Sequence, residues 1–407
     1  MKILTERAKL LIIIFAVSLL FCWYTQFDFI YLISAILASI LLLSFLFFCL
    51  TLTNVECERL MPDAAYEDER IKVSVTLKNR SIFTNYYIRL IDNFPADTVY
   101  SQEKRVLISH FARRSTINWI YEGLCFKRGV YWIGPFTIIG SDPLGLFRKY
   151  KVVNISSRLT VYPRIFNIYY LSPFMKGIMT PRYGPRTSRR SGEYEEFYGI
   201  REYRQEDGLR KIHWPSSAKH NELIVRHFEQ SGVHAVSIVL DLKRENNLGF
   251  GKETTLEYAV KIAASLSKYF LDLGSIVQLL AFEDKPLMSS FGRDPSHFFT
   301  ILELLAQVES NCSYSLEQVL TMLGAFIPPT STLIVIRLDN DIEAAKASEQ
   351  LIFHKNISII EVQLISDTFD KALSKYPSYY IQAKSSDVQT YRILGGADLE
   401  TSFSPVV

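Results

Sequence analysis

Cysteine and net charge are both scarce in this sequence of 407 residues. Five cysteines are scattered along the chain without a C-x-x-C pair or another metal-ligand spacing, which disfavours a disulfide framework and fits a reducing compartment. The 45 Lys and Arg residues nearly balance 42 Asp and Glu residues, so the net charge of +3 gives no support for binding nucleic acid. A glycine-rich phosphate loop, a G-x-S-x-G motif and an H-E-x-x-H motif are absent as well. We therefore expect no cofactor and no enzyme activity.

Charge is also missing from the start of the chain. No charged residue occurs from 10 to 27 or from 29 to 55, and each run is long enough to cross ~30 Å of hydrocarbon as a helix. A cleaved signal peptide is the alternative for the first run, but no A-x-A-like site follows it and the second run comes at once. We predict a transmembrane helical hairpin over residues 1–54, which contacts the lipid bilayer through residues 10–52.

The basic residues beside this hairpin predict its orientation. Lys2, Arg7 and Lys9 precede it, whereas no Lys or Arg occurs from residue 10 to 55. By the positive-inside rule the N-terminus lies in the cytoplasm, and a second span returns the chain to the same side. We expect a multi-pass protein of a bacterial inner (plasma) membrane, with the N- and C-termini cytoplasmic.

Residues 55–170 have the alternating pattern of β-strands. Apolar and polar residues alternate over Ile71–Asn79. The same pattern recurs in 87–92, 105–110 and 116–121. Short strands at roughly ten-residue spacing predict an antiparallel β-sandwich. We expect a turn at 142–147, after which Phe147 tucks back into the sandwich core.

Residues 233–407 alternate between buried strands and amphipathic helices. The expected strands are Val236–Asp241, Ile276–Phe282, Thr332–Leu338 and Ile357–Val362. The expected helices are 254–273, 296–308, 315–326 and 341–353. This alternation predicts an α/β domain with a largely parallel, doubly wound sheet. The fold class is thus α/β plus all-β, with membrane helices.

An arginine-rich linker and a charged segment, residues 171–232, separate these two domains. Arginines in the loop-forming stretch 172–192 leave two readings open: a solvated connector, or docking to lipid phosphates or an acidic partner. The stretch that follows resembles bacterial "domain of unknown function 58" proteins, whose signature is E-F-x-G-x-R-x-Y-x-x-G-D-x-x-R-x-I-H-W-x-x-S-A. The matching positions include Phe197, Gly199, Arg201, Tyr203, Asp207, Arg210, Ile212, His213, Trp214, Ser217 and Ala218. Two residues depart from it, Glu206 and Pro215.

We assign the signature residues a structural or interaction role. They are Arg201, Tyr203, Asp207, Arg210, His213, Trp214 and Ser217. We expect bidentate arginine–carboxylate pairs, a half-buried Trp214 and a His213 ring that donates to a backbone carbonyl, which together form a brace between the sandwich and the next domain. A recognition surface for a partner is the alternative. A catalytic cluster of Glu195, Asp207 and His213, as in a hydrolase acting on envelope material, is a third reading.

Histidines recur every seven residues, at His213, His220, His227 and His234. On a single helix they would form an aligned stripe able to bind a metal ion. Pro215 disfavours a helix at the start of this stretch, and the residues at its end favour strands. We therefore expect no metal stripe.

The first strand of the α/β domain ends in Asp241, which resembles a von Willebrand factor A domain. Metal-binding members of that family carry D-x-S-x-S at this edge, because hydroxyls and a carboxylate coordinate Mg²⁺. Here Lys243 and Glu245 take the two serine positions, and the lysine ammonium repels a cation. We predict a degenerate metal site in which Asp339, after the third strand, pairs with a cation instead. This disfavours a metal-dependent adhesion module, a further alternative.

The family resemblance also implies partners. Proteins with this signature are often encoded beside MoxR-type AAA ATPases and transglutaminase-like membrane proteins. We therefore expect a non-enzymatic, membrane-anchored cytoplasmic adaptor or scaffold that works with a MoxR-type ATPase in envelope-related assembly or stress processes, with a transglutaminase-like membrane protein as a further partner.

Overall fold

The protein is described by a computed structural model, which forms two compact units. The described residues are 4–25, 27–168, 171, 195–202, 212–220, 222–230, 234–329, 331–339, 357–369 and 388–403, with the backbone alone for 195–202, 220, 225–230 and 388. One unit comprises Met1–Ile165 with Leu302–Val308, and the other comprises Phe166–Ile301 with Glu309–Val407.

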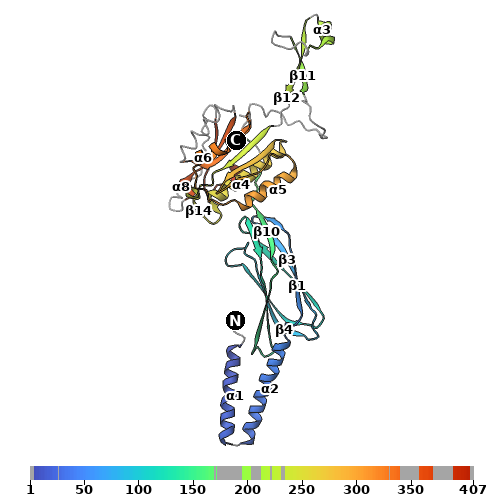
Figure 1. The fold of residues 1–407 in the computed structure, drawn as a ribbon, viewed down its shortest axis with the longest axis vertical. Helices are drawn as coiled ribbons and strands as arrows, with labels where there is room; N and C mark the ends of the chain where they lie inside the picture. The colour runs from blue at the N-terminus through green and yellow to red at the C-terminus, as the bar shows by residue number, and fades with distance from the viewer. Residues whose placement is uncertain are drawn as a thin grey trace. The chain divides into compact units, whose positions relative to one another are not determined.

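Two long helices begin the first unit, α1 (Glu6–Thr25) and α2 (Asp28–Leu50). They run side by side in opposite directions (Figure 1). With 20 and 23 residues they measure ~30 and ~35 Å at 1.5 Å per residue, and both are apolar enough to cross a membrane. Most of their large apolar side chains face outward, as Leu42 and Phe45 do. The predicted pair of long apolar helices is confirmed.

A β-domain follows the hairpin. Strands β1 (Val55–Leu60), β3 (Arg70–Asn79) and β6 (Thr116–Leu124) form one antiparallel sheet in the order β1-β3-β6. Strands β4 (Asn85–Asn93), β5 (Glu103–Phe111), β8 (Phe136–Ser141) and β9 (Arg148–Val153) form a second, in the order β5-β4-β8-β9. Strands β2 (Ala64–Tyr66), β7 (Gly129–Ile133) and β10 (Ser157–Tyr162) form a third. The predicted strands are present, but β2 pairs parallel with β10, so the domain is not wholly antiparallel.

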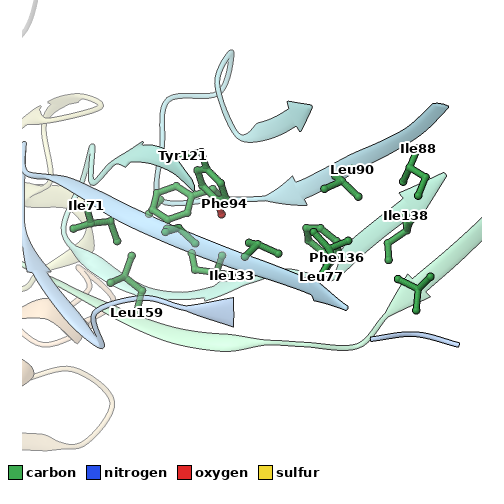
Figure 2. Close-up of a cluster of buried hydrophobic side chains, with 14 of the residues drawn as sticks. Ile71, Leu77, Ile88, Leu90, Phe94, Tyr121, Ile133, Phe136, Ile138 and Leu159 are labelled. Carbon is green, nitrogen blue, oxygen red and sulfur yellow. The ribbon is translucent and has the colours of Figure 1, made fainter. Parts of the chain in front are cut away.

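The apolar faces of these sheets share one core (Figure 2). Alternate residues of β3, such as Val73 and Val75, are fully buried, as are Ile88 and Leu90 of β4. This is the arrangement that a period of two dictates for a strand with one solvent face.

A polar network crosses this core. The Arg59 guanidinium of β1 forms a buried ion pair with Asp92 of β4, in which Nε donates to Oδ2 at 3.1 Å. The Tyr121 hydroxyl of β6 donates to the same Oδ2 at 2.6 Å. Burial, together with the charge of Asp92, raises the pKa of Tyr121. The network therefore links one strand of the β5-β4-β8-β9 sheet to two strands of the β1-β3-β6 sheet.

The turn 142–147 departs from expectation. The Asp142 carboxylate accepts hydrogen bonds from the amides of Leu144 at 3.0 Å and Phe147 at 2.7 Å, which closes the turn. Phe147 is buried, but its ring lies 5.9 and 5.8 Å from the rings of Phe45 and Phe48 in α2. The prediction that Phe147 returns to the sandwich core is wrong: it packs in a separate small cluster against the hairpin.

The second unit is built on a six-stranded sheet. Its strands are β13 (Ala235–Leu240), β16 (Ile276–Phe282), β17 (Pro286–Met288), β18 (Thr332–Leu338), β19 (Ser358–Leu364) and β20 (Val388–Ile393). Their order is β17-β16-β13-β18-β19-β20, and β17 alone is antiparallel to its neighbour. The four predicted strands and the largely parallel pairing are confirmed, whereas β17 and β20 were not predicted.

Helices α4 (Thr255–Asp272), α5 (Pro295–Gln307) and α6 (Leu316–Leu323) match three predicted helices, and the 3-10 turn Gly324–Phe326 extends the last. Thr254 accepts from the Glu257 amide at the start of α4, and Ser315 with Gln318 forms a capping box on α6. Outside residues 195–230, the other described elements are the short helices α8 (Ser366–Phe369) and α9 (Leu399–Ser402), the 3-10 turn Arg244–Asn246 and the small strand pair β14 (Gly249–Phe250) and β15 (Glu253–Thr254). The predicted helix 341–353 lies outside the described residues.

Candidate functional site

The signature segment forms a strand pair and a short helix. Strands β11 (Glu195–Glu202) and β12 (Ile224–Gln230) pair antiparallel, with an irregularity between Phe197 and Gly199. Helix α3 (Trp214–His220) precedes β12 in the chain.

Local hydrogen bonds join α3 to the start of β12. The buried Ser217 hydroxyl donates to the His213 carbonyl at 3.0 Å and accepts from the Ile224 amide at 2.9 Å. The His213 amide donates to the Ile224 carbonyl at 2.8 Å. The His213 ring meets the Ser216 hydroxyl at 2.7 Å, rather than the backbone carbonyl that we expected. Ser217 is therefore a structural link between helix and strand.

Trp214 overturns one expectation. Its side chain is 65% exposed at the first position of α3, so the prediction of a half-buried ring is wrong. Pro215 lies in the first helical turn, where a missing N–H leaves no bond unmade and the fixed φ suits the helix. Pro215 therefore starts the helix rather than preventing it, and it places Trp214 at the exposed end.

Only some residues of the predicted brace are among the residues that the structure describes. Tyr203, Asp207 and Arg210 lie outside the described residues. For Arg201 the backbone alone is described, where it pairs with Val225 across the β11–β12 ladder.

The strand register separates Glu195 from His213, two members of the catalytic cluster considered in the sequence analysis. Glu195 pairs with Gln230 at one end of β12, whereas the His213 amide bonds to Ile224 at the other. Six residues of extended chain span ~20 Å at ~3.3 Å per residue. Glu195 and His213 are therefore too far apart to act on one bond, and Asp207 lies outside the described residues.

The four regularly spaced histidines do not share a helix. His213 precedes α3, His220 ends it, His227 lies in β12 and His234 precedes β13. The backbone thus breaks the stripe, as expected. Burial lowers the pKa of His234, whose Nε2 lies 2.8 Å from the Thr332 hydroxyl.

A second candidate lies at the carboxyl edge of the six-stranded sheet. Here Asp241 follows β13, and the neighbouring β18 ends just before Asp339. Asp241 Oδ1 accepts from the Lys243 amide at 3.0 Å, and Oδ2 accepts from the Asn246 side chain at 2.6 Å. Both carboxylate oxygens already have donors from the loop that follows the strand. In parallel α/β sheets this edge, where connections diverge, is the usual place for ligands.

The residues at the two serine positions pair with each other. The Lys243 ammonium lies 3.0 Å from a carboxylate oxygen of Glu245. Asp339 accepts from the Ser366 amide at 3.0 Å, and no cationic partner for it occurs among the described residues, which differs from the pairing we expected. Within the described parts of the chain, no group of three or more His, Cys, Asp or Glu side chains converges as metal ligands would.

Beside Asp241 lies a small hollow that the sequence did not reveal. Asn246, Thr255, Ser310 and Arg337 help to line it, and it has room for about one water molecule. Arg337 is buried and its Nη2 lies 2.8 Å from the Glu361 carboxylate of β19. Arg337, within the largely apolar strand Thr332–Leu338, is the sequence signal that could have indicated this hollow. Among the described residues, this hollow is too small for a metabolite.

Comparison with known proteins gives a family match for the second unit. Residues 199–387 match the model of the family described as "Protein of unknown function DUF58". This supports the family resemblance. The matched range holds most of the signature residues, including Trp214 and Ser217, together with most of the six-stranded sheet.

Other comparisons add little. No curated protein matches the chain. Among solved structures, the CARDB domain of a Pyrococcus furiosus protein in complex with di-metal ions is similar at 12% identity, with a TM-score of 0.20, covering 26% of this chain and 92% of that one. A β-glucosidase from Listeria innocua is similar at 12% identity, with a TM-score of 0.15, covering 27% of this chain and 16% of that one. Likenesses this weak carry no functional argument.

Proposed function

We propose that this chain is a non-enzymatic, membrane-anchored adaptor of the DUF58 family. The hairpin α1–α2 spans the inner (plasma) membrane twice, both termini lie in the cytoplasm, and the two units present surfaces to partners there. The long apolar helices, and the basic residues at and before the start of α1, support this arrangement.

The exposed ring of Trp214 is the observation that carries the proposal. A tryptophan that is 65% exposed is a large apolar surface in contact with water. Ser217 and Ile224 fix the helix that bears it, so the ring is presented from an ordered base. Tryptophan is among the residues that contribute most to protein–protein binding when buried at an interface. Of our two main readings of the signature, recognition of a partner is therefore the one that we favour.

The α/β domain is proposed to be von Willebrand factor A-like, with its metal edge replaced by internal contacts. Five parallel strands, one antiparallel edge strand and an aspartate after the first strand support this. The Lys243 amide and the Asn246 side chain donate to the Asp241 carboxylate, and the Lys243 ammonium pairs with Glu245. Because these oxygens would otherwise serve a cation, the edge suits a scaffold better than a metal-dependent adhesion module.

By family resemblance, the proposed partner is a MoxR-type AAA ATPase, with a transglutaminase-like membrane protein as a second. Envelope-related assembly or stress is the corresponding process.

Affinity capture of the full chain from detergent-solubilised membranes tests the proposal. Trp214→Ala should lower recovery of the ATPase at least about tenfold, as expected for loss of an interface anchor worth ~2 kcal/mol or more. Trp132→Ala in β7 is the matched control, because that ring is 61% exposed. It should leave recovery unchanged, and both variants should keep the wild-type melting temperature. Absence of any AAA ATPase from an intact wild-type sample, or equal recovery with both variants, would refute the proposed role.

A further inference from the structure

The first unit has a set of loops at the point where the hairpin meets the β-domain. We call the loops Arg80–Thr84, Ala112–Ser115 and Asp142–Phe147, together with the adjoining Arg148, the proximal rim. Each is tied, directly or through a neighbour, to an end of α1 or α2.

The turn 142–147 is fixed to the start of α1. The Thr5 amide donates to the Leu146 carbonyl at 3.0 Å, and the Thr5 hydroxyl donates to the Gly145 carbonyl at 3.0 Å. Ala8 of α1 packs with Leu146 and Phe147 in one buried cluster.

The loop Arg80–Thr84 is fixed to the chain just after α2. The Arg80 amide donates to the Asn54 carbonyl at 3.0 Å, and the Leu52 amide donates to the Asn85 side chain at 3.0 Å. The Asn79 side chain then reaches the Ala112 carbonyl at 2.9 Å, which holds the third loop beside the first.

Apolar side chains project from the rim into solvent. Ile82 is 62% exposed, Leu144 is 54% exposed and Phe83 is 40% exposed. Exposed apolar residues also occur elsewhere on the domain, as at Val99, and single ones need no explanation; these three share the end of the domain to which the hairpin is attached. Apolar tips at this place would be covered if they entered the acyl–headgroup boundary of a bilayer.

Basic side chains accompany the apolar tips. Arg113, Arg114 and Arg148 are exposed, and none of them forms a salt bridge with a described residue. Lys149 reaches back to the last turn of α2, where its ammonium donates to the Cys49 carbonyl at 3.2 Å and lies 5.8 Å from the Phe48 ring. The acidic residue of the rim, Asp142, is buried and bonded within its own turn.

The membrane geometry brings these features to one plane. The headgroup layers add only ~5–7 Å on each side of the hydrocarbon core. Helix α2 ends at Leu50, and the first bond from the chain beyond it to the β-domain is made at Leu52. A rim attached within two residues of a spanning helix lies at headgroup depth, where exposed arginines are attracted to anionic lipid.

We propose that the proximal rim is a binding surface for anionic phospholipid headgroups of the membrane that the hairpin spans. Ile82, Phe83 and Leu144 enter the acyl boundary, and Arg113, Arg114 and Arg148 contact lipid phosphates. The β-domain therefore contacts the bilayer directly, rather than being held away from it. The inference rests on the membrane anchoring in the proposed function.

Photo-crosslinking to lipid tests the proposal in the full chain, reconstituted into vesicles of phosphatidylcholine and phosphatidylglycerol at 3:1. The photoreactive residue p-benzoylphenylalanine replaces one position at a time, and mass spectrometry identifies the adducts. Ile82 probes the rim, and the exposed Leu42 in the middle of α2 reports insertion of the hairpin. Leu60, 77% exposed at the end of β1 that lies away from the hairpin, is the matched negative control.

Positions 82 and 42 should yield lipid adducts and position 60 should not. At position 82, the ratio of phosphatidylglycerol to phosphatidylcholine adducts should be about two- to fivefold higher than the 1:3 ratio of the vesicle. The double change Arg113→Glu with Arg148→Glu should abolish that enrichment, whereas Arg70→Glu with Arg158→Glu, at exposed arginines outside the rim, should not.

The outcomes separate the two proposals. Adducts at position 42 without adducts at position 82 would overturn the rim and leave the anchor standing. No adduct at position 42 would overturn the anchor, and the rim with it. Adducts at position 82 without enrichment of the anionic lipid, or a crosslinked dimer in their place, would also overturn the rim proposal.

Discussion

The β-domain core and the signature helix use polar side chains in opposite ways. In the β-domain, Arg59, Asp92 and Tyr121 are buried together and link strands of two sheets. At α3, the polar side chains of Ser217 and His213 bond, among the described residues, to near neighbours in the chain and to the start of β12, while Trp214 is exposed.

The two sets of polar contacts differ in how far they reach across the fold. A charge buried away from its partners is costly, so a cross-sheet ion pair fixes how two sheets meet. Bonds between neighbours fix only a local turn, and they leave its outer face free for another task.

The largest effect is expected from Asp92→Asn. This change leaves the buried guanidinium of Arg59 without its carboxylate, at a cost of ~3–5 kcal/mol in stability of the β-domain. Hydrogen exchange of β4 amides in the detergent-solubilised chain measures the loss. The control Glu58→Gln breaks an exposed pair with Lys78 and should cost less than ~1 kcal/mol. Equal protection of the β4 amides from exchange in the two variants would contradict a difference in cost between the buried and the exposed ion pair.

A smaller effect is expected from Ser217→Ala. The buried Ile224 amide then loses its hydroxyl acceptor, at a cost of ~1–3 kcal/mol confined to α3 and the start of β12. Faster exchange of the amides at 213–224, with unchanged exchange in β4, is the expected readout. The control Ser216→Ala removes only a contact to the His213 ring and should have little effect. If exchange in β4 also quickened, α3 would be a global brace after all.

The smallest effect concerns pH and His234→Gln. Burial lowers the folded-state pKa of His234 below the ~6.5 of an unfolded chain. Below that value the unfolded chain binds a proton that the folded chain does not, so stability falls as the pH drops through ~6.5 toward the folded pKa. Gln keeps a partner for the Thr332 hydroxyl but cannot titrate. From pH 8 to 5.5 the melting temperature should therefore fall less steeply for the variant than for the wild type. An equal fall in both would contradict a buried, neutral imidazole.

Much of the second unit was predictable because its strands are buried on both faces. Runs such as Thr332–Leu338 read as strands without reference to any partner, and their bounds agree with the structure to within about two residues. Strand β17 was missed because three residues beginning with Pro286 carry no periodic signal.

The errors share one physical reason, since sequence patterns show that a residue is apolar but not which surface it meets. Phe147 was correctly expected to be buried, yet its partners lie in α2, about a hundred residues earlier. Trp214 was expected to be half-buried from its residue type, although Pro215 and Ser217 decide where the helix begins and which side faces inward. The Arg59–Asp92 pair was missed, but Asp92 shares the inward parity of Ile88 and Leu90, which was a usable signal.

The bond between Thr5 and Leu146 has a consequence for biosynthesis. Its two residues are 141 positions apart. A ribosome adding about 5–20 residues per second needs ~7–30 s to make the intervening chain. Throughout that interval the first turn of α1 lacks its acceptors, and Ala8 lacks the covering of Leu146 and Phe147. The contact between the start of α1 and the turn 142–147 therefore closes only after that turn has emerged from the ribosome.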